Sequence, residues 1–173
     1  MNNTVKKITI LGMLLAAEVV ASRFISVSLP LVKIGFGFLP LSITAMLFGP
    51  LWAGAAAVLS DFMVAMMGPY GYYPPMAISA LCTGIIYGLF LHKKPVTTWK
   101  IFLCVATQSI LVSIFLQTYW LTLLTGKGYL ALLSTRVAQN LITIPIDTFC
   151  IRMVGSRVVH LVEKGGIRVS AQN

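Results

Sequence analysis

Residues 34–60, IGFGFLPLSITAMLFGPLWAGAAAVLS, contain no Asp, Glu, Lys or Arg. Residues 62–91 and 101–126 are uncharged in the same way. A helix needs about 20 consecutive apolar residues to cross the hydrocarbon core of a membrane. Each run is long enough, and three such runs exceed what one signal peptide supplies. The chain is therefore predicted to be an all-α integral membrane protein.

The composition of the whole chain supports this class. Of its 173 residues, 58% are hydrophobic and 10% are charged, and the mean hydropathy is +0.90. A soluble domain carries about 25% charged residues, so this chain has too few polar groups to cover a surface that faces water. The net charge of +9 comes from Lys and Arg located between the apolar runs. We interpret it as a signal for membrane orientation and expect no nucleic-acid partner.

Glycine and proline divide the chain into six predicted transmembrane helices. Gly49-Pro50 and the segment 68–75 are strong breaks. The helices are expected over residues 8–29, 37–48, 51–67, 76–91, 99–124 and 129–162. The last helix is expected to kink near Pro145. No linker or block of charge separates a second domain, so residues 1–173 are predicted to form a single transmembrane substrate-binding domain.

The distribution of Lys and Arg predicts how the helices are oriented. With six helices, both termini lie on one side of the membrane. That side would hold Lys6, Lys7, Lys93, Lys94, Lys100, Arg157, Lys164 and Arg168. The opposite loops hold only Lys33 and Lys127. Because positively charged loops stay in the cytoplasm, both termini are expected to be cytoplasmic, and the loops 30–37, 68–75 and 125–128 are expected to face outward.

Ionisable side chains within membrane helices are costly and are candidates for function. The predicted helices contain Glu18, Arg23, Asp61, Arg136, Asp147 and Arg152. For Arg23, Asp61 and Arg136 we favour ligand binding, because the two arginines flank an outward mouth whose loops are rich in aromatic residues. For the other three we favour internal ion pairs that hold the bundle together.

Aromatic and amide side chains gather near the same predicted mouth. Gly68-Pro69 and Pro74-Pro75 frame a loop with three tyrosines, which is interpreted either as a lid over a flat ring or as part of an interfacial aromatic belt. The aromatic and amide candidates for ligand contact are Phe38, Tyr70, Tyr73, Gln108, Trp120 and Asn140. A pocket of cations, amides and aromatic rings suits an anionic, planar, hydrogen-bonding solute.

The chain also carries a pair of small residues on its first predicted helix and lacks the common catalytic motifs. Ala17 and Ala21 are four residues apart, a spacing that lets another helix approach closely, with packing inside the bundle as the alternative. The chain has no P-loop, HExxH, CxxC or Ser-His-Asp pattern, so no catalytic or metal-binding residue is predicted and the protein is expected not to be an enzyme. Cys82, Cys104 and Cys150 are interpreted as small apolar side chains rather than disulfide partners.

Four stretches together resemble the S components of energy-coupling factor (ECF) transporters, and within them the folate-specific branch. They are SRFIS at 22–26, IGFGFLP at 34–40, LFGPLWAG at 47–54 and SALCTGIIYGLF at 79–90, with Asp61 between the last two. The resemblance extends over nearly the whole chain. The second and third stretches are its most specific parts.

This resemblance implies a membrane subunit of six helices that binds one vitamin from outside. Such a subunit joins a transmembrane coupling subunit and two cytoplasmic ATPases in the bacterial cell membrane, and reorients in the bilayer to release the vitamin inward. ATP would be used only by the partner subunits, so no cofactor is expected on this chain. Ala17 and Ala21 match the surface by which the family docks to its partners, although the usual run of three alanines is reduced to Ala16-Ala17.

A folate ligand implies roles for the candidate residues. Contacts with the pterin and benzamide rings are expected from Phe38, Tyr70, Tyr73 and Trp120. Asp61 is expected to accept hydrogen bonds from the pterin N–H groups, and Gln108 or Asn140 would complete that edge. The partners of the two carboxylates are expected among Arg23, Lys33 and Arg136. Arg23 is alternatively a partner of the pterin carbonyl oxygen.

Two alternative functions remain open from the sequence. One alternative is the S component for another vitamin, namely pantothenate, thiamine or riboflavin. The other is a free-standing carrier driven by an ion gradient, with Glu18, Asp61 and Asp147 as a proton relay. A panel of vitamins separates the first alternative, and uptake into liposomes that depends on a pH gradient would support the second.

Overall fold

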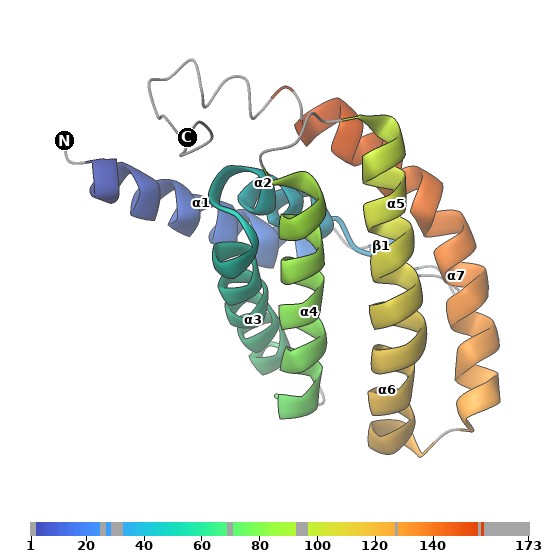
Figure 1. The fold of residues 1–173 in the computed structure, drawn as a ribbon. Helices are drawn as coiled ribbons and strands as arrows, with labels where there is room; N and C mark the ends of the chain where they lie inside the picture. The colour runs from blue at the N-terminus through green and yellow to red at the C-terminus, as the bar shows by residue number, and fades with distance from the viewer. Residues whose placement is uncertain are drawn as a thin grey trace.

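The computed structural model describes residues 3–24, 27–28, 33–68, 71–92, 97–126, 128–155 and 157. Its elements are α1 (Asn3–Arg23), β1 (Val27–Ser28), β2 (Lys33–Ile34), α2 (Phe38–Phe48), α3 (Pro50–Met66), α4 (Pro74–Leu91), α5 (Thr98–Gln108), the π-helix η1 (Ser109–Gln117), α6 (Thr118–Thr125), α7 (Tyr129–Cys150) and the π-helix η2 (Ile151–Gly155). Figure 1 shows α5 and α6 stacked end to end beside α7, whereas α3 and α4 lie side by side and α1 runs across them. The six predicted helices are confirmed, the fifth as α5–η1–α6 and the sixth as α7–η2 up to residue 155. The predicted continuation of the sixth helix over 158–162 lies outside the described residues.

The first helix ends earlier than predicted. α1 stops at Arg23 rather than at residue 29, and the chain instead forms two short antiparallel strands in which Val27 pairs with Ile34. A residue that precedes proline, here the one before Pro30, is disfavoured in a helix. β-branched residues such as Val27 and Ile34 suit an extended backbone. The prediction of a helix through residue 29 was therefore wrong.

Helices α3 and α4 approach each other closely at two glycines of α4. A Cβ on Gly84 would overlap the backbone of Ala53, and a Cβ on Gly88 would overlap Pro50. Ala53 is fully buried, as are most of the small residues of the Ala-rich run at 53–57. Small residues allow backbones to approach closely in membranes, where dispersion rather than the hydrophobic effect drives helix packing. This confirms the interpretation of that run as internal packing.

The fifth span (α5–η1–α6) and α7 each depart from regular α-helical geometry. The fifth span changes from α-helix to the π-helix η1 at Ser109 and returns to α-helix at Thr118. The hydroxyl of Thr118 donates to the carbonyl of Ser113, five residues earlier, over 3.1 Å. α7 continues through Pro145, and Figure 1 shows its axis bending in the half of the helix that contains this proline. Proline removes one backbone hydrogen bond, which explains a bend in that half.

The surface of the described bundle suits a bilayer. Pro74–Leu91 and Thr98–Leu124 are long and apolar enough to cross a membrane, and only 28% and 39% of these windows are buried. The core helix of a soluble protein would be mostly buried. α2 and α3 are apolar but shorter. Large apolar side chains such as Leu51, which is 82% exposed, cover the outside, as expected for residues that face lipid. All three cysteines are free.

Candidate functional site

A polar cavity of about 400 Å³ lies inside the bundle, where α1, α2, α3, α4, the fifth span and α7 converge. Its volume falls in the range of about 300–1,000 Å³ that is typical of small-molecule sites. The lining residues are Glu18, Ser22, Gly35, Gly37, Phe38, Leu41, Ala57, Ser60, Asp61, Val64, Ala80, Thr83, Tyr87, Gln108, Ser109, Ser113, Gln117, Arg136, Gln139, Asn140, Thr143 and Asp147. Most of these side chains are polar, which is unusual for the interior of a membrane bundle.

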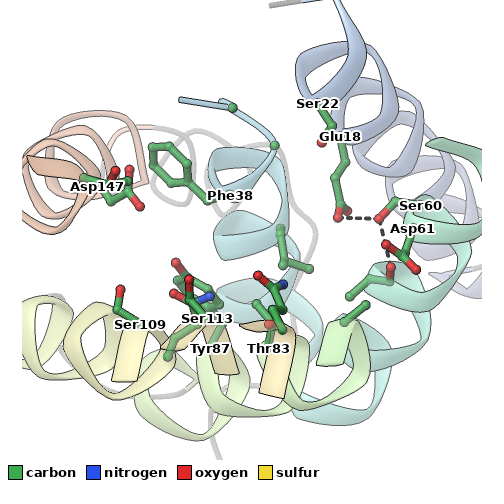
Figure 2. A pocket seen from close by; sticks show the side chains of 18 of the residues that line it. Glu18, Ser22, Phe38, Ser60, Asp61, Thr83, Tyr87, Ser109, Ser113 and Asp147 are labelled. Carbon is green, nitrogen blue, oxygen red and sulfur yellow. Dashed lines mark hydrogen bonds between the residues drawn. The ribbon is translucent and has the colours of Figure 1, made fainter. Parts of the chain in front are cut away.

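One wall of the cavity is formed by carboxyl and hydroxyl groups of α1 and α3. Ser60 Oγ donates a hydrogen bond of 2.6 Å to Glu18 Oε1, and Figure 2 shows the two side chains directed at each other with Asp61 next to them. Glu18 Oε2 is buried and has no partner among the described residues. Asp61 is only half-buried, whereas Glu18 is 4% exposed. Asp61 is therefore the carboxylate on this wall that a ligand can reach.

The opposite wall is a polar seam between the fifth span and α7. Arg136 Nη1 donates to Gln117 Oε1 over 3.3 Å, and Asn140 Nδ2 donates to Ser113 Oγ over 3.1 Å. On α7, the lining positions 136, 140, 143 and 147 recur at helical spacing, so they share one face. π-helical segments such as η1 occur frequently at functional sites. The seam thus presents amides, hydroxyls and one guanidinium to the cavity.

The third side of the cavity is closed by the segment that leads into α2. Gly35, Gly37 and Phe38 all line the cavity. A Cβ on Gly37 would overlap the hydroxyl of Ser22, so the chain passes against the end of α1 without space for a side chain. Figure 2 shows the ring of Phe38 between the α1–α3 wall and Asp147 of α7. An aromatic ring in this position can stack on a flat ligand.

The charge and length of the cavity restrict what it can bind. Among the described lining residues, three are acidic and Arg136 is the single cation. Asp147 lies eleven residues after Arg136, which places the two about 16 Å apart along the helix axis. The cavity therefore suits an elongated solute with N–H donors at one end and negative charge near Arg136. No group of three metal-ligating side chains occurs among the described residues.

Five of the ten predicted ligand contacts line this one cavity. They are Phe38, Asp61, Gln108, Arg136 and Asn140. They come from four different elements that are far apart in sequence, and the fold brings them around the same space. Their contact with a ligand stays a prediction, because lining the cavity establishes only where these side chains lie.

Three of the other five predicted contacts, Arg23, Tyr73 and Trp120, are described but do not line the cavity. Arg23 is exposed, and its Nη2 donates 2.8 Å to the carbonyl oxygen of Met67 at the end of α3. Tyr73 immediately precedes α4, and the buried Nε1 of Trp120 has no partner among the described residues. The two remaining contacts fall outside what is described: Tyr70 and the side chain of Lys33.

The two residues of the predicted docking pair differ in exposure. Ala17 is exposed on α1, whereas Ala21 is 7% exposed and packs inside the bundle. Only Ala17 presents its side chain at the surface, together with the exposed neighbours Gly12 and Ala16. A docking face on α1 would consequently be centred on these three positions and not on Ala21.

Several lining residues were not predicted as ligand contacts. Glu18 and Asp147 were interpreted as members of internal ion pairs, but Glu18 accepts a hydrogen bond from the hydroxyl of Ser60 and both carboxyls line the cavity. The hydroxyl groups of Ser109 and Ser113 were not singled out at all. The repeated polar positions on one face of α7 were the available signal, because a polar stripe on a membrane helix faces a cavity or another helix.

A lipid-facing exterior around a polar internal cavity defines a membrane protein that binds a solute within its helical bundle. The model of the family "ECF-type riboflavin transporter, S component" matches residues 2–163. The chain is 36% identical to the folate transporter FolT of Clostridium novyi (strain NT) over 150 residues, which cover 84% of this chain and 87% of that one. It is 28% identical to FolT of Leuconostoc mesenteroides over 149 residues, which cover 82% and 80%.

A solved structure is also similar. The crystal structure of FolT bound with folic acid superposes with a TM-score of 0.79 at 33% identity, and the match covers 88% of this chain and 93% of that chain. The chain therefore belongs to the ECF-type riboflavin transporter S-component family. It is a transporter component embedded in a membrane and not an enzyme, as predicted.

Proposed function

We propose that this chain is the folate-binding S component of an ECF transporter in a bacterial cell membrane. It captures folate from outside and delivers it inward by reorienting within a complex with a transmembrane coupling subunit and two cytoplasmic ATPases. Both of its termini face the cytoplasm. The elongated polar cavity with Asp61, Phe38 and Arg136 is the observation that supports a folate-like ligand most directly. The two related folate transporters and the similar structure that contains folic acid support the same vitamin.

The chemistry of folate fits the cavity part by part. Its pterin edge carries amino and ring N–H donors, and the half-buried Asp61 is a strong acceptor for them. Phe38 provides an aromatic face for one of the two rings. The glutamate tail carries two carboxylates, and Arg136 is the single cation among the described lining residues. The tail therefore lies at Arg136 and the pterin lies on the carboxylate side.

The first experiment is to identify what the purified chain releases. The ultraviolet spectrum and the mass spectrum of the denatured protein should show a pterin compound near one per chain, and the emptied protein should bind added folate. Release of a different vitamin would keep the transporter class and reject folate. A chain that is empty and does not bind folate would contradict the proposal and favour the gradient-driven carrier, for which liposome uptake is the test.

Riboflavin is the second candidate ligand, because the matching family model is named for it. A flat ring system with hydrogen-bonding edges is common to both vitamins, but riboflavin has no carboxylate. Folate binding should therefore depend on Arg136, whereas riboflavin binding should not. Titration of the wild-type protein and Arg136→Gln with both vitamins separates the two: equal affinity of both proteins for folate would contradict the assignment of the tail.

Arg23 provides a test of the mouth of the cavity. We expect Arg23→Ala to weaken folate binding about tenfold, the usual cost of losing one charged hydrogen bond. Its present bond to the carbonyl of Met67 offers a competing role as a cap on the end of α3. Isothermal titration measures the affinity and thermal unfolding measures stability. A lower Tm with unchanged affinity would remove Arg23 from the site.

Ala17 tests docking to the transport complex. Ala17→Trp should leave folate binding intact and abolish uptake by the full complex, because a bulky ring would separate α1 from a closely packed partner helix. Ile8→Trp is the control, since Ile8 is 61% exposed and lies on the other edge of the exposed face of α1. Uptake that survives Ala17→Trp would assign Ala17 to the lipid-facing surface instead.

A further inference from the structure

A second cavity lies between the beginning of α5 and the C-terminal half of α7. It has a volume of about 430 Å³ and is lined by Thr97, Thr98, Trp99, Phe102 and Thr148. None of these residues lines the polar cavity. Figure 1 shows this place at the upper end of the bundle, where the beginning of α5 lies beside the C-terminal half of α7.

The walls of this groove are apolar. Trp99 and Phe102 stack with ring centroids 5.8 Å apart at 24°, and they are 67% and 39% exposed. Thr148 Oγ1 donates to the carbonyl of Ile144 over 2.8 Å, so its hydroxyl is used within its own helix. Burial of a polar solute against such walls would cost free energy, because its polar groups would lack hydrogen-bonding partners. A hydrocarbon chain has no polar groups and carries no such cost.

Two cationic residues of the described chain lie close in sequence to residues that line the groove. Lys100 follows Trp99 directly, and Arg152 lies about one helical turn beyond Thr148. In the sequence, Lys93 and Lys94 come shortly before Thr97, and no acidic residue occurs between positions 92 and 100. Asp147 is next to Thr148 but lines the polar cavity. The groove therefore combines an apolar slot with a cationic border.

We propose that this groove is a binding site for an anionic phospholipid. One acyl chain occupies the cavity beside Phe102 and Thr148, the ring of Trp99 lies at the level of the headgroup, and the phosphate is held by Lys100 and Arg152. Basic pockets between transmembrane helices bind anionic headgroups, and tryptophan favours the membrane interface because its ring is partly polar. The site is independent of the vitamin, so it stands or fails separately from the proposed function.

Native mass spectrometry tests the site on the full-length chain. The protein is titrated with phosphatidylglycerol and, separately, with phosphatidylcholine that has the same acyl chains. We expect a saturable phosphatidylglycerol adduct that is preferred over phosphatidylcholine. Thr148→Trp fills the cavity and should weaken this adduct about tenfold, and Lys100→Gln should remove most of the preference for the anionic headgroup.

Controls decide how each result is interpreted. A cooperative thermal unfolding transition shows that both variants are folded, and Thr98→Trp fills the groove from the other wall if Thr148→Trp does not fold. Phe115→Ala, at an exposed position in η1 of the fifth span, should leave the adduct unchanged. The proposal is overturned if all variants retain the adduct equally, because the adduct is then non-specific lipid that surrounds the protein. It is also overturned if lipid binds only after residues 158–173 are removed, which means that this segment is the occupant.

Discussion

Gly84→Ala is expected to lower the Tm of the detergent-purified protein by about 10 °C, a large effect for a single added methyl group. The added Cβ would meet the carbonyl oxygen of Ala53 and the Cα of Gly54, which are backbone atoms that no rotamer change can move aside. α3 and α4 would have to separate, at a cost of about 3 kcal/mol, the upper part of the usual range for overpacking. The better helix propensity of alanine offsets at most about 1 kcal/mol of this.

Gly12→Ala is the matched control for this substitution. Gly12 is also helical, but it is exposed and has no atom within 4 Å of its added Cβ. The variant should unfold at the wild-type temperature or slightly above it. Gly88→Ala, whose Cβ would overlap Pro50, should behave like Gly84→Ala. A Tm for Gly84→Ala as high as that of Gly12→Ala would contradict the close approach of α3 and α4.

Asp61→Asn is expected to weaken folate binding by about tenfold to a hundredfold. A hydrogen bond to a charged group is worth about 1.5–3 kcal/mol, and the amide replaces one strong acceptor by a donor that faces the donors of the pterin. Glu18→Gln is the control on the same wall. One oxygen of Glu18 accepts from Ser60 and the side chain is only 4% exposed, less than the half-buried Asp61. The affinity of Glu18→Gln for folate should therefore change about threefold at most.

The direction of the Asp61 effect also reports the pose of the ligand. Loss of a negative charge near a dianion would favour binding through weaker long-range repulsion. If Asp61→Asn binds folate more tightly, the carboxylates of the ligand lie at Asp61 and the proposed orientation is reversed. Titration of the wild-type protein and both variants at the same ionic strength distinguishes these outcomes, because screening changes only the long-range part.

Sequence reasoning predicted positions around the cavity unevenly. Arg136 was singled out as an ionisable group within a membrane helix and Asn140 as an amide near the predicted mouth, and both line the cavity. Arg23 was selected as an ionisable group too; its guanidinium donates to the carbonyl of Met67 at the end of α3, and its contact with a ligand stays a prediction. Helical spacing shows which residues share a face, but it does not show the rotation of that face relative to the neighbouring helices. For the same reason, the sequence did not predict that Ala17 is exposed whereas Ala21 is buried.

The membrane class, the six helical segments and the family could be predicted from the sequence, because hydropathy, helix breakers and motif residues are properties of local stretches of chain. The tertiary structure alone decided that Glu18 accepts from Ser60, that Asp61 is the accessible carboxylate, and that α7 and the fifth span form a polar seam. Burial and hydrogen-bond partners arise from contacts between segments far apart in sequence. They depend on how the helices cross and rotate, which no local pattern contains.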